Sequence, residues 1–442
     1  MKLTIPEPTI ELYKDGFDKH DKLDRKPMAQ KLSNLVENVD DPLVIALDGG
    51  WGSGKSVFLK CWVGEHLKRH RDKTTTLYFD AFEHDYLDDP LIVLTGALAE
   101  RLKESGRKPA ALKKLKTAAF KIAPMAARLG LAAVTAGGTE IAGALGDAII
   151  HQSAENVEKA AEAYWKREDG RRAAMAQFRE ALTSLTKPDE NGDPQQKLVI
   201  VIDELDRCRP DYALQMLEVI KHFFATPGVH FVLGTNMQEL ANSVRARYGD
   251  RVDAERYLHR FVQITMPMPS ASENRPSERA AVKHFGVITD ALEINSDIWR
   301  IFNQYLLTIN QAQDLTLRDV ERLATLMVIT PTQYNENNRE YYIFAGLLIL
   351  QVLKPQWVQQ AREGKLTFSQ LRTLFHWSEK NPDPWLAEMV QPAWRISLDP
   401  APDEATKSEA ENALDKTFVE KTSRTIVTEI ITQSLDSFKL PR

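Results

Sequence analysis

The sequence is poor in cysteine, with only Cys61 and Cys208 among 442 residues. Neither cysteine has a companion at the spacing of a metal site, and the first residues, MKLTIPEPTIELYKDGFDKHD, lack the apolar stretch of a secretory signal. We therefore expect two reduced, buried thiols rather than a disulfide framework, in a cytoplasmic protein.

The chain also lacks a large charge of one sign, because 57 lysine and arginine residues stand against 62 acidic ones. Because of this balance, the chain as a whole lacks the excess of positive charge that is typical of nucleic-acid-binding proteins. Low-complexity tracts are missing, and so is any repeat that would indicate a solenoid. The composition, 43% hydrophobic and 27% charged, is typical of a soluble globular protein, and the length indicates two or three domains.

Glycine is concentrated in LDGGWGSGKSVFLK, residues 47–60. The spacing fits a P-loop, in which backbone N–H groups cradle phosphates, a lysine reaches the β/γ oxygens and a hydroxyl binds Mg²⁺. Residues 43–47 indicate a buried parallel strand and residues 57–63 a helix whose N-terminus would face the phosphates. That context argues against a chance glycine-rich loop. The predicted nucleotide-binding residues are Gly49, Gly50, Trp51, Gly52, Ser53, Gly54, Lys55, Ser56 and Val57.

A second apolar run, residues 197–202, ends in Asp203 and Glu204. A P-loop NTPase takes its magnesium carboxylate from the end of another buried strand. We predict that Asp203 holds Mg²⁺ together with Ser56, and that Glu204 orients and deprotonates the attacking water. The alternative is a strand that ends in a solvated acidic turn, which the P-loop upstream disfavours.

A further strand is predicted at residues 229–234, with Asn236 just beyond its end, and a short one at residues 77–80. Polar groups at the carboxyl edge of a parallel sheet face the ligand crevice, so Asn236 could sense the γ-phosphate or position the water. Capping of the helix predicted at residues 237–244 explains Asn236 equally well.

Several blocks in the first three quarters of the chain match one known family in residue type and order. They are DKLDR (21–25) with the helix 27–39, the P-loop GGWGSGKS (49–56), YFDAFE (78–83), VIDELDRC (201–208), YLHRF (257–261) leading to TMPMP (265–269), and LRDVERL (317–323). Together they resemble the KAP P-loop NTPases, in the STAND and AAA+ neighbourhood, whose namesakes are a neuronal membrane scaffold and a phage-exclusion protein. The sequence departs from the family at Asp80 and Phe82, where Asn and Trp are usual, and at Glu204, which replaces a second Asp.

The resemblance implies roles for three arginines outside the P-loop. Arg318 and Arg322 would form a lid pair that senses the nucleotide, and Arg260 would be a finger that acts on a neighbouring subunit. Arginine can stabilise charge that develops on the γ-phosphate, and the candidates are Arg207, Arg260, Arg318 and Arg322, although each of the four taken singly also fits a surface or salt-bridged residue. A bacterial or phage setting, with a role in phage exclusion, is a further implication of the family.

The interval between Ser56 and Asp203 far exceeds the roughly 30 residues that a βαβ unit needs, so a segment is inserted. KAP proteins often carry transmembrane helices there, but the longest uncharged run, Leu129–Thr139, is well short of the roughly 20 residues of a span, and we reject a membrane-spanning segment. Residues 154–185 have the pattern of an amphipathic helix. Nine basic residues precede the apolar part: Arg101, Lys103, Arg107, Lys108, Lys113, Lys114, Lys116, Lys121 and Arg128.

This basic stretch leaves three interpretations open. It could lie on an anionic membrane surface, contact nucleic-acid phosphates, or be a solvated helix followed by a helical hairpin packed on the protein or on a second subunit.

We therefore predict an α/β P-loop NTPase with a parallel sheet core, a helical insertion, a helical lid and a helical C-terminal domain. The expected parts are residues 1–99 and 191–270 for the core, 100–190 for the insertion, 271–333 for the lid and 334–442 for the C-terminal domain. The predicted activity is Mg²⁺-dependent ATP hydrolysis by a homo-oligomer with an unidentified protein partner. A nucleotide-dependent scaffold with negligible turnover and a nucleic-acid-associated ATPase are the alternatives, and a small-molecule kinase is disfavoured because no acceptor site is evident.

Overall fold

The computed structural model describes most of the chain between residues 9 and 436. The described ranges are 9–70, 73–87, 89–104, 109–122, 172–190, 192, 194–268, 280–309, 315–330, 339–377, 386–399, 402–414, 418–419 and 425–436. The chain divides into two compact units. We call residues 10–49 and 55–268 the sheet unit, and residues 1–9, 50–54 and 269–442 the helical unit.

The sheet unit is built on five parallel strands in the order β2-β3-β4-β1-β5. Their bounds are β1 Leu43–Asp48, β2 Thr74–Asp80, β3 Lys197–Asp203, β4 Val229–Thr235 and β5 Ile264–Pro267. Strands β1, β3 and β4 are nearly continuous apolar runs, because helices cover both faces of a parallel sheet. The register pairs Asp80 with Asp203 and Asp48 with Thr235, so polar residues gather at the carboxyl edge.

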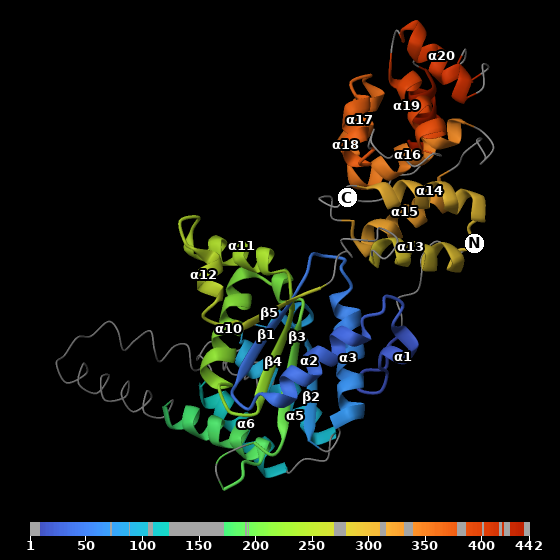
Figure 1. Cartoon of the computed structure of the whole chain (residues 1–442). Helices are drawn as coiled ribbons and strands as arrows, with labels where there is room; N and C mark the ends of the chain where they lie inside the picture. The colour runs from blue at the N-terminus through green and yellow to red at the C-terminus, as the bar shows by residue number, and fades with distance from the viewer. Residues whose placement is uncertain are drawn as a thin grey trace, which may run out of the picture. The chain divides into compact units, whose positions relative to one another are not determined.

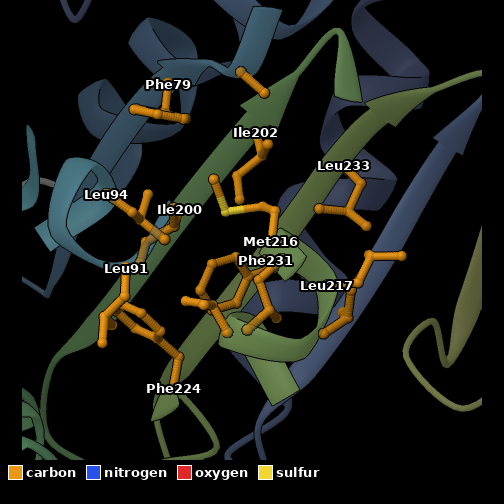
Figure 2. Close-up of a cluster of buried hydrophobic side chains, with 14 of the residues drawn as sticks. Phe79, Leu91, Leu94, Ile200, Ile202, Met216, Leu217, Phe224, Phe231 and Leu233 are labelled. Carbon is orange, nitrogen blue, oxygen red and sulfur yellow. The ribbon is translucent and has the colours of Figure 1, made fainter. Parts of the chain in front are cut away.

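Successive strand residues point to opposite faces of the sheet, and each face has its own core. On one face Ile200, Ile202, Phe231 and Leu233 pack against helices that include α10, whose Met216 and Leu217 lie over the strands (Figure 2). On the other face the intervening strand residues pack against α2 and α3 (Figure 1). Helices of the sheet unit are α1 Phe17–His20, α2 Lys26–Asn38, α3 Lys55–His70, α4 Ala81–His84, α5 Pro90–Glu104, α6 Pro109–Ile122, α10 Pro210–Phe223, α11 Met237–Tyr248 and α12 Ala254–Leu258, with the 3₁₀ turn η1 Leu205–Arg207.

The helical unit has a separate apolar core centred on α16, whose ten residues from Tyr341 to Leu350 are all buried. Trp394 is fully buried against it, and its Nε1 donates to the Tyr305 hydroxyl (2.9 Å), which in turn donates to the Tyr342 carbonyl (2.8 Å). The described helices are α13 Ala280–Ala291, α14 Ser296–Thr308, α15 Leu317–Ile329, α16 Glu340–Leu353, α17 Pro355–Arg362, α18 Phe368–Leu374, α19 Gln391–Leu398, α20 Glu404–Ala413 and α22 Thr425–Ile430, with π-helical turns η3 Leu386–Val390 and η4 Ile431–Leu435.

The predicted fold class is confirmed: a parallel sheet flanked by helices, followed by helices. The short strand β5 was not among the predicted strands, and it lies at the sheet edge, where Pro267 costs no ladder hydrogen bond. Cys61 and Cys208 are buried free thiols, as predicted. The finer division into five parts stays a proposal.

The insertion is described only at its two ends. Helix α6 and the helical residues 172–186 flank it, whereas the apolar stretch and most of the helix predicted over 154–185 lie outside the described residues. Within the described parts of the chain, no helix combines the length and the apolar character of a membrane span.

Candidate functional site

The P-loop lies between the end of β1 and the start of α3, as the sequence predicts. Gly52 and Gly54 have φ of 76° and 82°, a left-handed conformation that favours glycine. Lys55 opens α3 with its side chain buried, and its Nζ donates to the carbonyl of Gly49 at 2.5 Å. Burial lowers the pKa of Lys55, and the nearby carboxylates of Asp206 and Asp203 oppose that shift. The loop therefore curls around its own lysine.

One further feature of the loop fits a bound group that exchanges hydrogen bonds with it. The hydroxyl of Ser53 is buried and has no hydrogen-bond partner among the described residues. A buried hydroxyl without a partner is uncommon in native proteins. Trp51 and Val57 are partly exposed.

Gly52 belongs to the helical unit and touches the start of α15 there. The amide of Leu317 donates to the Gly52 carbonyl at 3.0 Å. A Cβ added to Gly52 would come within 2.9 Å of the Cβ of Arg318. Glycine is therefore required at this position both for its φ and for this close approach.

Asp203 ends β3 with its carboxylate almost entirely buried (1% exposed). Oδ2 accepts from the Tyr78 hydroxyl at 2.7 Å, and Oδ1 accepts from the Glu204 amide at 3.0 Å. The Ser56 hydroxyl is also within hydrogen-bonding reach of this carboxylate. Burial raises the pKa of Asp203, and the hydrogen bonds from Tyr78 and Ser56 oppose that rise.

The neighbourhood of Ser56 and Asp203 fits a magnesium ion. It joins a hydroxyl oxygen and a carboxylate oxygen at the carboxyl edge of the sheet, directly after the phosphate-binding loop, and Mg²⁺ prefers such hard oxygen ligands. Tyr78 is a site residue that sequence reasoning missed. The only signal was its place two residues before the end of β2, which the register sets beside β3.

Glu204 follows Asp203 in the left-handed conformation, with φ of 59°. For a residue other than glycine this conformation is uncommon and costs free energy, which is typical of functional turns. Its Oε2 accepts from the Arg207 guanidinium at 2.9 Å. Burial raises the pKa of Glu204, whereas Arg207 lowers it. The sharp turn after β3 thus brings Glu204 next to Asp203 and pairs it with Arg207.

Asn236 follows β4, which lies between the P-loop strand β1 and the Asp203 strand β3. Its Oδ1 accepts from the amides of Gln238 (3.1 Å) and Glu239 (3.4 Å), so it caps α11. The capping alternative is therefore realised, and a second role toward the γ-phosphate stays a prediction.

The three arginines to which the resemblance gives roles are divided between the two units. Arg260 is exposed just after α12, with its guanidinium 5.4 Å from the centre of the Tyr257 ring. Arg318 and Arg322 lie on α15 of the helical unit, which begins with a capping box formed by Thr316 and Asp319. Their predicted roles stay predictions.

Comparison with protein families decides where the chain belongs. The KAP family P-loop domain matches residues 25–333, well over half of the chain. The chain belongs to the KAP family. The match spans both the P-loop and the turn after β3, and it confirms the resemblance that the motifs carried. This KAP chain therefore has a nucleotide-binding P-loop domain.

No curated protein gives a significant match. Among solved structures, the ORC2 protein of Aeropyrum pernix in its ADPNP-ADP complexes is 10% identical, with a TM-score of 0.34, and the match covers 92% of this chain and 94% of that one. DnaA from Aquifex aeolicus bound to AMPPCP is 13% identical, with a TM-score of 0.28 and coverage of 94% and 95%. Drosophila ORC bound to DNA is 12% identical, with a TM-score of 0.30 and coverage of 94% and 96%.

Proposed function

We propose that this KAP chain is a Mg²⁺-dependent NTPase that binds and hydrolyses ATP. The observation that carries the proposal is the juxtaposition at one sheet edge of three groups: the P-loop with buried Lys55, the Ser56–Asp203 pair, and Glu204 on a left-handed turn. A phosphate cradle, two oxygen ligands and a carboxylate base are the parts that phosphoryl transfer to water needs.

Each residue has a defined task in this proposal. The amides of residues 49–56 and the Lys55 ammonium bind the phosphates and neutralise their charge. Ser56 and Asp203 hold Mg²⁺, which when bound draws charge from the phosphate oxygens. Glu204 accepts the proton of the attacking water, and for this its carboxylate must exchange the Arg207 guanidinium for the water.

We further propose that the nucleotide state controls the packing of the lid and the insertion, and through them oligomerisation. The family's phage-exclusion namesake makes defence against phage the setting we favour. Arg318 and Arg322 then report the nucleotide to the lid, and Arg260 reaches a neighbouring subunit. In this proposal the protein works in the cytoplasm, with association to a membrane surface as the alternative location.

The test measures phosphate release with ATP and Mg²⁺ in the wild type, Lys55→Ala, Glu204→Gln and the control Lys68→Ala, with light scattering on the same samples. Lys68 is a half-exposed lysine on the same helix, α3, far from the P-loop. We expect Lys55→Ala to lose ATP binding and turnover, Glu204→Gln to bind ATP without hydrolysing it, and Lys68→Ala to behave as the wild type. ATP bound equally well by Lys55→Ala would overturn the proposal.

The same measurement separates the scaffold alternative. A wild type that binds ATP and changes mass with it, but releases no phosphate, would be a nucleotide-dependent switch rather than a hydrolase. The ion pair between Glu204 and Arg207 is the observation that favours this second candidate, because it occupies the proposed base.

A further inference from the structure

A second cluster of ligand-type side chains lies in the sheet unit, at the far end of α3 from the P-loop. Glu37 is on α2, and His66 and His70 are one turn apart on α3. One ligand atom from each of the three lies within 4.8 Å of the other two. Two histidines at positions i and i+4 present their rings on one helix face, which is a common arrangement for a metal site.

The distances between these atoms are close to those of a coordination shell. Nε2 of His66 lies 3.1 Å from Oε1 of Glu37, and Nδ1 of His70 lies 3.8 Å from Oε2 of Glu37. Ligand atoms about 2.0–2.1 Å from a tetrahedral zinc stand about 3.3–3.5 Å apart. A shift of a few tenths of an ångström would therefore bring both pairs into range.

The His66 ring nitrogen nearest the carboxylate is an unsatisfied polar atom. His66 is fully buried (0% exposed), and despite the short separation its Nε2 makes no hydrogen bond to any described residue. Its separation from Oε1 of Glu37 is short enough for a hydrogen bond, but the geometry at the ring nitrogen is not that of one. Buried polar atoms in native proteins almost always have a partner, and a cation between them would supply one.

Neighbouring hydroxyls hold two of these side chains in place. The Ser33 hydroxyl lies 3.0 Å from the other ring nitrogen of His66, Nδ1, and Trp62 Nε1 donates to that same hydroxyl at 3.0 Å. The Thr74 hydroxyl donates to Glu37 Oε1 at 2.6 Å. Such outer contacts fix ring orientation and carboxylate position in metal sites.

We propose that Glu37, His66 and His70 form a zinc site. Two imidazoles and a carboxylate are a donor set for Zn²⁺, and His70, whose side chain is 28% exposed, puts one side of the site next to solvent. The site ties α2 to the C-terminal end of the helix that begins at Lys55. Eleven residues of α3, roughly 16 Å, separate His66 from Lys55, so this site is distinct from the Mg²⁺ ligands.

The test uses the full chain without a histidine tag, stripped with a chelator and free of nucleotide, and titrates it with Zn²⁺ by calorimetry in excess Mg²⁺. We expect one Zn²⁺ per chain, because nitrogen ligands select zinc over magnesium. His66→Ala, His70→Ala and Glu37→Gln should each weaken binding at least about 100-fold, and Thr74→Val about 10–100-fold. The control is His284→Ala, which removes a histidine paired with a single carboxylate, Glu321 (2.8 Å).

Circular dichroism identifies variants that fail to fold. If buried His66→Ala fails to fold, the partly exposed position in His70→Ala still tests the site. Co²⁺ in place of Zn²⁺ should give the strong visible absorption of a four-coordinate site in the wild type and in Lys55→Ala. A wild type that binds no Zn²⁺, or a folded His70→Ala that binds it as tightly as the wild type, would show that the cluster is a metal-free buried ion pair.

Discussion

The two carboxylates that follow one another at the end of β3 are held by different neighbours. Asp203 accepts from Tyr78 on the adjacent strand, and Glu204 pairs with Arg207 one turn later. Asp203 is buried and needs donors to remain charged, whereas the carboxylate of Glu204 is partly exposed and pairs with a partly exposed arginine. The difference between the two environments suits a fixed metal ligand at Asp203 next to a base at Glu204 that changes its hydrogen-bond partner.

Tyr78→Phe tests whether the Tyr78 hydroxyl stabilises the charged form of Asp203. Loss of the hydroxyl removes a hydrogen bond that favours the charged carboxylate, so the pKa of Asp203 rises further. Hydrolysis needs the charged carboxylate, so on acidification the variant should lose activity at a higher pH than the wild type. The acidic limb of the kcat/KM profile should move up by about one pH unit. The measurement is the pH profile of phosphate release.

Tyr212→Phe is the matched control, because its hydroxyl is buried and has no hydrogen-bond partner among the described residues. We expect it to leave the acidic limb in place. Equal profiles for Tyr78→Phe and the wild type would mean that the Tyr78 hydroxyl does not set the charge of Asp203.

At the scale of the element, α16 combines a fully buried stretch with one glycine at its closest contact. A Cβ on Gly346 would lie 2.6 Å from Cζ2 of Trp394, and the indole cannot move without breaking its hydrogen bond to Tyr305. Gly346→Ala should therefore destabilise the helical unit by about 1–2 kcal/mol, since overpacking outweighs the gain in helix propensity. Urea unfolding measures this change in the free energy of unfolding.

Gly286→Ala in α13 is the control for that substitution. A Cβ there meets nothing within 4 Å, and its backbone is helical, so the change should stabilise the protein by about 0.5–1 kcal/mol. If the two alanines shifted stability in the same direction, close packing at Trp394 would not be the reason for glycine at 346.

Helix α6 has an apolar face in the sheet unit's core and a basic face in solvent. Leu112, Leu115 and Ala118 are buried, and Lys113, Lys114, Lys116 and Lys121 are exposed. Replacing Lys113, Lys114 and Lys116 with alanine should change the unfolding free energy by less than about 0.5 kcal/mol.

If the basic stretch contacts nucleic acid, the same triple variant should bind DNA or RNA more weakly. The slope of log binding constant against log salt concentration should fall in magnitude by about 0.9 per lysine removed. Gel shifts across salt concentrations check this, and DNA or RNA binding that ignores the change would exclude the nucleic-acid role of α6.

At the scale of the whole molecule, the proposed oligomer predicts complementation between inactive variants. A subunit with Arg260→Ala keeps an intact P-loop and both carboxylates, whereas a subunit with Glu204→Gln keeps an intact Arg260. If Arg260 acts across a subunit boundary, mixing the two should restore phosphate release to roughly a quarter to a half of the wild type, because mixed interfaces then join an intact site to an intact arginine. The control is Arg256→Ala, an exposed arginine on α12, the helix just before Arg260, and this variant should be active alone. No recovery on mixing, with subunit exchange verified, would place Arg260 outside a neighbour's site.

The sequence by itself determined the elements whose information is local. Apolar runs predicted β1, β3 and β4, glycine spacing predicted the P-loop, and the acidic end of residues 197–203 predicted the partner strand, because a strand buried on both faces and a phosphate-binding loop each demand their own residue types over a few positions. The family also followed from such blocks, and the match over residues 25–333 confirms it.

Only the tertiary structure decided which distant residues meet. The register of β2 with β3 sets Tyr78 against Asp203, and the packing of α2 on α3 brings Glu37 to His66 and His70. Local sequence marks only where these residues stand and not which residues they meet, since a tyrosine in a strand or a histidine in a helix has the same propensity whatever lies opposite. Strand order and helix packing are properties of the whole core, and contacts between residues far apart in the chain follow from them.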